Sequence, residues 1–369
     1  MSEKIPVVVY PFQADLLPII RSFDTLQSKY ELKRILTFPG SGLVGKDAAF
    51  SCNLPEIGLE VGEFTTDNLE GIEYVLMINP LHPTKATDDD IIDKSIIALG
   101  QNRSVKLFCN RSDSIAHSAG KLREIYPRFS ISFDECVDEN LEFTGTLHYK
   151  KLDVPVLLLG SLIETPEILD IICYLSENFS KENIKCLIFA NTPAGSLFGF
   201  KSGVPILSSN EFSEATKVEE LNRFANNLIS RFNPDIVLIE APDAVLRFND
   251  ITPNGFGIQS YMISQAFQPD HFICSIPIEL AIPDLVLSLS KDFETRIGTP
   301  ITAALASNIA IDAAENLQTH SISYVFIPMQ YYDVKFPNNI DKSSIPIYKS
   351  GNRSDIGLCD YICQTLGME

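Results

Sequence analysis

Residues 73–79 read EYVLMIN and residues 105–109 read VKLFC, and these two stretches decide the fold. Each is a short apolar run next to polar or turn-forming residues, which predicts a buried strand. Between them, residues 91–100 are apolar at helical spacing, and the three aspartates at 88–90 precede that segment as they would at a helix start. A strand, a helix and a second strand in this order predict parallel strands joined by a crossover helix.

The same alternation continues on both sides of this unit. Further strands are predicted at 5–10, 32–38, 154–160, 185–190, 235–240, 272–276 and 323–328, and further helices at 15–22, 112–126, 166–179, 211–232, 257–268 and 301–316. A polar, acidic and turn-rich stretch at 134–152 interrupts the pattern. The predicted fold class is therefore α/β, with mainly parallel sheets in two αβ-alternating domains, residues 1–140 and 150–369.

The composition excludes several classes of partner. The 369 residues include 29 Lys plus Arg against 48 Asp plus Glu, a net charge of −19, and the basic residues form no cluster. This charge repels nucleic acid and anionic membranes, so we expect neither as a partner. No apolar run reaches about 18 residues and no signal core opens the chain. The eight cysteines are scattered without a C-x-x-C motif. We expect a cytoplasmic protein with reduced thiols and no metal site.

A glycine-rich stretch at 40–47 reads GSGLVGKD, one residue away from the phosphate-binding pattern G-x-x-x-x-G-K-[S/T]. Asp replaces the hydroxyl residue that normally reaches magnesium. Two interpretations stay open: a phosphate site for a nucleotide with magnesium, and a structural turn or peptide-contact loop. The candidate residues in either case are Gly40, Gly42, Gly45, Lys46 and Asp47.

The turn after the strand at 154–160 lies where a nucleotide-binding domain would place its phosphate loop. Residues 160–167 read GSLIETPE, with one glycine, no lysine and two glutamates, which would repel phosphate. We therefore predict an ordinary strand-to-helix turn, and the second domain resembles a degenerate P-loop-like domain.

A candidate substrate-binding edge follows the strand at 235–240. Glu240 and Asp243 fall at its carboxyl end, where ligands lie in open α/β sheets. Asn254 and Gly255 open the next helix and could supply backbone donors. The five histidines are isolated and no nucleophile motif is complete, so the sequence names no catalytic residue.

Several short sequence motifs in the second half of the chain occur in an order that resembles that of a known protein family. They are Gly199-Phe200-Lys201-Ser202, the helix with Glu214, Lys217 and Asn222, residues 234–242 (PDIVLIEAP), and residues 254–261 (NGFGIQSY). The first half adds Gly42-Leu43 and Gly45-Lys46-Asp47-Ala48. Over residues 5–335 the chain resembles the clostridial peptide maturation system proteins, which are encoded beside short ribosomal precursor peptides and a radical S-adenosylmethionine maturase.

The resemblance implies an accessory role in the maturation of a ribosomally synthesised, post-translationally modified peptide. The implied partners are the precursor peptide and the radical S-adenosylmethionine maturase, and no reaction carries over. The family has the same residue as Asp47, and it is expected to have a lysine where this sequence has Pro166 and Glu167. The rival hypothesis is a nucleotide-binding enzyme or switch with its phosphate site at residues 40–47.

Overall fold

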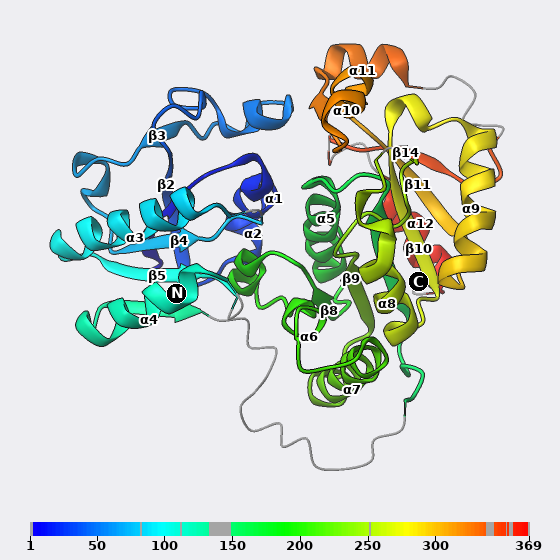
Figure 1. Ribbon diagram of the computed structural model, residues 1–369, viewed down its shortest axis with the longest axis horizontal. Helices are drawn as coiled ribbons and strands as arrows, with labels where there is room; N and C mark the ends of the chain where they lie inside the picture. The colour runs from blue at the N-terminus through cyan, green and yellow to red at the C-terminus, as the bar shows by residue number, and fades with distance from the viewer. Residues whose placement is uncertain are drawn as a thin grey trace. The chain divides into compact units, whose positions relative to one another are not determined.

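The computed structural model describes residues 3–81, 83–110, 113–132, 149–250, 252–336, 343–351, 353 and 357–367. The chain folds into two compact units. The first comprises Met1–Glu142 with Ala190–Ser208, and the second comprises Phe143–Phe189 with Ser209–Glu369. Figure 1 colours the first unit mainly blue to cyan and the second mainly green to red. Most of the predicted boundary at 134–152 lies outside the described residues.

The first unit is built on a six-stranded parallel sheet in the order β3-β2-β1-β4-β5-β6. The strands are β1 (Ile5–Tyr10), β2 (Tyr30–Thr37), β3 (Val61–Glu63), β4 (Tyr74–Ile78), β5 (Ser104–Phe108) and β6 (Phe129–Ser132). The helices are η1 (Ala14–Leu16), α1 (Leu17–Arg21), α2 (Phe23–Leu26), η2 (Ala48–Cys52), η3 (Asp67–Leu69), α3 (Lys85–Gly100), α4 (Ile115–Ile125), η4 (Pro193–Phe198) and α6 (Val204–Leu207). This strand order is that of doubly wound dinucleotide-binding sheets.

The second unit contains another six-stranded parallel sheet, in the order β14-β11-β10-β7-β9-β8. Its strands are β7 (Val156–Ser161), β8 (Cys186–Phe189), β9 (Ile236–Glu240), β10 (His271–Pro277), β11 (Ile301–Ser307) and β14 (Ile347–Lys349), and β12 (Ile309–Ile311) pairs antiparallel with β13 (Tyr324–Phe326). The helices are α5 (Glu167–Lys181), α7 (Glu214–Phe232), η5 (Asn254–Gly257), α8 (Ile258–Phe267), η6 (Ile278–Leu280), α9 (Pro283–Ile297), α10 (Ala313–Thr319), α11 (Met329–Lys335) and α12 (Leu358–Leu366). The predicted α/β class with parallel sheets is confirmed.

One excursion from the second half of the chain packs on the first unit. Residues 190–208, which follow β8, carry η4 and α6. Gln27 Nε2 donates a buried hydrogen bond to the Leu197 carbonyl, and the rings of Phe23 and Phe198 meet edge to face. The sequence pattern predicts this segment to lie in the second domain, because nothing in its composition indicates which core covers it.

Two predicted helices differ from the structure. The segment predicted as a helix at 301–316 begins as the strand β11, which pairs with β10 and β14, and only Ala313–Thr319 is helical. The helix predicted to start at the three aspartates begins earlier, because Thr84 caps it in a reciprocal pair with Thr87. The aspartates therefore lie inside α3, within its first two turns.

Candidate functional site

The carboxyl edge of the second sheet has a topological switch point between β7 and β10. These two strands are neighbours in the sheet. From β7 the chain passes through α5 to β8 on one side, and from β10 it passes through α9 to β11 on the other side. Connections that leave in opposite directions open a crevice above the two strands, which is where open α/β sheets bind ligands.

Glu167 lies at this switch point. It is the first residue of α5, and the Ser275 hydroxyl of β10 donates a short hydrogen bond to its Oε2 atom. The Glu167 residue as a whole is partly exposed, but its Oε1 atom is buried without a hydrogen-bond partner. An acceptor left in that state is costly unless a ligand or water meets it.

More hydroxyl groups line the neighbouring strand ends. Tyr332 of α11 donates to the Ala306 carbonyl and accepts from the Ser350 N–H at 3.0 Å. The Ser350 hydroxyl also donates to the Ala306 carbonyl, at 2.9 Å. Ser307 ends β11, is 1% exposed, and its hydroxyl has no partner. Glu167 therefore stands beside a buried layer of hydroxyl groups.

The pKa of Glu167 is raised to about 7. Burial of the carboxyl group is the main cause, the hydrogen bond from Ser275 opposes it, and the negative charge of Asp170 adds to it. Burial and the charge of Glu167 also raise the pKa of Tyr332. A carboxyl group that titrates near neutrality can either donate or accept a hydrogen bond, and such groups concentrate at functional sites.

The Asn254–Gly257 segment forms an unusual turn on the same edge. Its four residues all have positive φ angles, of 48°, 67°, 59° and 65° in chain order. Residues other than glycine rarely adopt this left-handed region, and they seldom do so in succession. Phe256 is therefore held in a conformation that costs energy, as occurs where the surroundings over-determine the backbone.

Three contacts hold this turn. Gly257 packs so closely on Val245 that a Cβ atom would lie 2.5 Å from the Val245 carbonyl oxygen. The Arg296 guanidinium donates a short hydrogen bond to the Phe256 carbonyl. Asp243 accepts from the Ser260 N–H at 2.8 Å and thereby caps the start of α8. Burial raises the pKa of Asp243, against the opposing effect of these hydrogen bonds and of Arg296.

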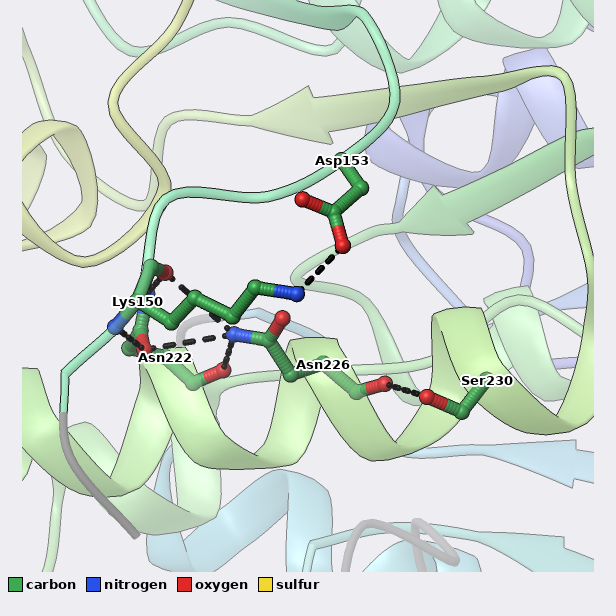
Figure 2. A network of polar contacts seen from close by, with 5 residues as sticks. All are labelled: Lys150, Asp153, Asn222, Asn226 and Ser230. Atoms are coloured by element: carbon green, nitrogen blue, oxygen red, sulfur yellow. Dashed lines mark hydrogen bonds and ion pairs between the residues drawn. The ribbon is translucent and has the colours of Figure 1, made fainter.

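The far end of α8 is anchored by Asn222 of α7, which bonds to the Ala266 carbonyl. Figure 2 shows the contacts of Asn222 with Lys150 and Asn226. The Asn222 amide nitrogen donates to the carbonyls of Lys150 and Ala266, and its oxygen accepts from the Lys150 N–H at 3.1 Å. Asn226, one turn later, donates to the Asn222 carbonyl at 3.0 Å. Because α8 is fixed at both ends, the turn in front of it is preorganised.

The turn presents apolar side chains to solvent. Phe256 is 49% exposed, Ile258 55% and Tyr261 44%. Beside them the Asn254 Nδ2 atom is buried without a partner. Backbone hydrogen bonds from Leu162 to Ser275 and from Val245 to Ser161 join the loop before Glu167, and the residue on which Gly257 packs, to the same sheet edge.

Three of the four predicted substrate-binding residues come together in this arrangement. Asp243 and Gly255 are neighbours, since a Cβ atom on Gly255 would lie 3.6 Å from Asp243 Oδ2. Asn254 belongs to the same turn. Glu240 is the last residue of β9, where it pairs with Leu159.

The predicted glycine loop follows β2, and the switch point of the first sheet lies between β1 and β4. Gly40, Gly42 and Gly45 have positive φ angles, as the turn requires. The N–H groups of Gly45 and Lys46 donate to the carbonyls of Val61 and Leu43, at 2.9 and 3.0 Å. The Lys46 ammonium lies 3.9 Å from the ring centre of Phe50. The two N–H groups and the Lys46 ammonium are therefore engaged in contacts that stabilise the loop.

Asp47 organises the loop. Its Oδ1 atom accepts from the N–H groups of Ala49 and Ile57, at 2.9 and 3.1 Å. Its Oδ2 atom accepts from those of Gly58 and Leu59, at 2.8 and 3.1 Å. The five-residue helix η2 that follows is too short to provide a helix dipole. Four backbone donors explain why a carboxylate stands where a phosphate loop has a hydroxyl.

Replacing Asp47 by Ser, which completes the phosphate-loop pattern, should therefore destabilise the protein. One hydroxyl can cap η2 but cannot accept the remaining bonds, so we expect a loss of about 2 kcal/mol in urea unfolding. Lys46→Ala should cost less than about 1 kcal/mol. Calorimetric titration with magnesium–ATP should give no heat for either variant or for wild type. Tight ATP binding by Asp47→Ser would refute this account of the loop.

Other sequence predictions concern metals and membranes. Among the described residues, no group of three or more His, Cys, Asp or Glu side chains is arranged to hold a metal ion. Two of the histidines, His82 and His148, and the cysteine Cys136 lie outside the described residues. Within the described part of the chain, no helix is long and apolar enough to cross a membrane.

No protein-family model and no curated protein sequence matches this chain. Among solved structures it is similar to a DUF1611 family protein from Anabaena variabilis, with a TM-score of 0.61 and 9% identity over 99% of this chain and 100% of that one. Chloroplast FtsY from Physcomitrella patens aligns with a TM-score of 0.33 and 14% identity, over 77% of this chain and 82% of that one. The first similarity shows that the chain shares its fold with a protein of known structure.

Sequence reasoning missed Glu167. From the sequence, the loop that holds Glu167 is considered only as a phosphate site, and its two glutamates would repel phosphate. A glutamate in the first turn of a helix is also common, so it gives no separate signal. The sequence does give a positional signal for a site here, because the loop that holds Glu167 follows the first strand of the second strand–helix alternation. The hydroxyl groups of Ser275, Ser307 and Ser350 carry no sequence signal, because parallel pairing alone brings them to this edge.

Proposed function

We propose that this protein is an accessory protein of peptide maturation that binds a precursor peptide at the carboxyl edge of its second sheet. The resemblance to the clostridial peptide maturation system proteins supports the biological role. The observation that carries the binding site is the preorganised Asn254–Gly257 turn, with the exposed side chains of Phe256, Ile258 and Tyr261 beside it.

The chemistry of this edge suits a peptide. Exposed aromatic and aliphatic side chains on a rigid frame bind apolar side chains without a large entropic cost. The unpartnered Asn254 Nδ2 atom is a donor for a peptide carbonyl oxygen. The nucleotide alternative has less support. The N–H groups of Gly45 and Lys46, which would bind a phosphate, already donate to backbone carbonyls, and the Asp47 carboxylate already accepts from backbone N–H groups.

Titration with a short ribosomal precursor peptide of the clostridial peptide maturation systems tests the proposal, with fluorescence anisotropy of the labelled peptide as the readout. We expect saturable binding that Phe256→Ala weakens by about tenfold, the effect of losing one central aromatic contact. The matched control is Phe232→Ala on the last turn of α7, since Phe232 is similarly exposed at 47%. Equal affinity of both variants and wild type would contradict the proposed site, and no binding by wild type would contradict the function.

A further inference from the structure

A cluster of oxygen-bearing side chains lies at the carboxyl edge of the first sheet, in the other unit. Asn79 follows β4, Asn110 follows β5 and Asp88 lies on α3. Asp113 joins the two asparagines, because its Oδ2 atom accepts from Asn79 Nδ2 and from the Asn110 N–H, both at 2.8 Å. The next residue, Ser114, donates a short hydrogen bond to Asp88 Oδ2. Short connections thus bring five polar residues into one cluster.

Three oxygen atoms in this cluster are buried without a hydrogen-bond partner. They are the Oδ1 atoms of Asn79, Asp88 and Asn110. Asn79 is 1% exposed and Asp88 7%. An unsatisfied buried acceptor is destabilising, so three of them in one cluster point to a ligand that meets them.

The orientation of the Asn79 amide follows from its partner. A carboxylate accepts and cannot donate, so the Asn79 atom that meets Asp113 must be the nitrogen. The carbonyl oxygen is then the atom left for a ligand. Asn110 has the same arrangement, since its Nδ2 atom lies 3.4 Å from Asp113 Oδ1. Asp113 is therefore a positioning residue that turns two amide oxygens away from itself.

We propose that the Oδ1 atoms of Asn79, Asp88 and Asn110 bind a hard divalent cation, Mg²⁺ or Ca²⁺. All three atoms are acceptors, so their ligand must be a cation or a donor. Carboxylate and amide oxygens are the ligands that these two ions prefer, and water completes the coordination shell. A divalent charge balances the two carboxylates of Asp88 and Asp113. The site does not depend on peptide binding.

The position in the fold supports this assignment. Strands β1 and β4 are neighbours, and their outgoing connections lead to opposite sides of the sheet, so they form the switch point of the first unit. Asn79 stands directly after β4 at this point. The outer hydrogen bonds from Asp113 and Ser114 are the second layer that holds ligands in place at metal sites.

Calorimetric titration of Ca²⁺ and of Mg²⁺ into the chelator-treated full-length protein tests the site. Wild type should bind one equivalent, and the tighter of the two ions identifies the preference. Asp88→Asn keeps the shape of the side chain but removes its charge and should abolish measurable binding. Asp89→Asn, an exposed neighbour on the same helix, should bind like wild type.

A second variant keeps the test decisive if Asp88→Asn fails to fold. Ser114→Ala removes only the hydrogen bond that orients Asp88, and we expect about tenfold weaker binding, as for other outer partners of metal ligands. No binding of either ion by wild type would overturn the proposal. Unchanged affinity in folded Asp88→Asn, or in Ser114→Ala when Asp88→Asn does not fold, would also overturn it.

Discussion

Glu167→Gln should make the protein more stable than wild type at about pH 8, by on the order of 3 kcal/mol. Burial raises the pKa of Glu167 from 4.5 to about 7 in the folded protein, so ionising this carboxyl group opposes folding. The folded state then holds a proton that the unfolded chain has lost between pH 4.5 and about 7. Stability from this group is full below that window and falls as the pH rises through it.

Urea unfolding at about pH 5 and about pH 8 measures this effect as a difference between variants. Wild type should lose stability relative to Glu167→Gln as the pH rises, because glutamine resembles the protonated acid and does not titrate. Glu182→Gln, at the exposed end of the same helix, should follow wild type at both pH values. Parallel curves for Glu167→Gln and wild type would mean that the carboxyl group titrates normally.

Gly257→Ala should destabilise the protein by about 3 kcal/mol or more. The added methyl group meets the Val245 backbone at 2.5 Å, and the φ angle of 65° disfavours any side chain. Gly255→Ala is the matched control, since Gly255 also has a positive φ angle but only a side-chain oxygen lies within 4 Å of its added methyl group. It should cost about 1–2 kcal/mol.

Thermal or urea unfolding of the two glycine variants distinguishes the backbone strain of a positive φ angle from the steric clash with Val245. Gly257→Ala should also lose peptide binding, because the turn cannot keep its shape, whereas Gly255→Ala should retain most of it. Equal stability losses for both variants would show that the close approach of Gly257 to Val245 does not hold the turn.

The alternation of strands and helices could be predicted because central parallel strands are continuous apolar runs. The strand β7, buried at all six residues, is the clearest case. The strand β11 could not be predicted, because Ala303, Ala304 and Ala306 favour a helix in isolation. In the structure these three side chains are buried in a strand between two neighbours, and burial overrides local preference.

The candidate site could be predicted only in part. The Asn254–Gly257 turn has a sequence signal, since two glycines and an asparagine in four residues indicate left-handed backbone. The partner Arg296, about forty positions later, has none. Asp47 could be noticed as a departure from the phosphate-loop pattern, but its reason is the set of N–H groups at 57–59, which only the folded loop brings to it.

Hydrogen–deuterium exchange with and without the precursor peptide tests the central claim most directly, because it locates the bound peptide on the chain. We expect protection at residues 254–261, the turn and the first residues of α8, with little change in the loop at 40–47. Binding accompanied by protection at the glycine loop and none at 254–261 would contradict the proposed peptide site.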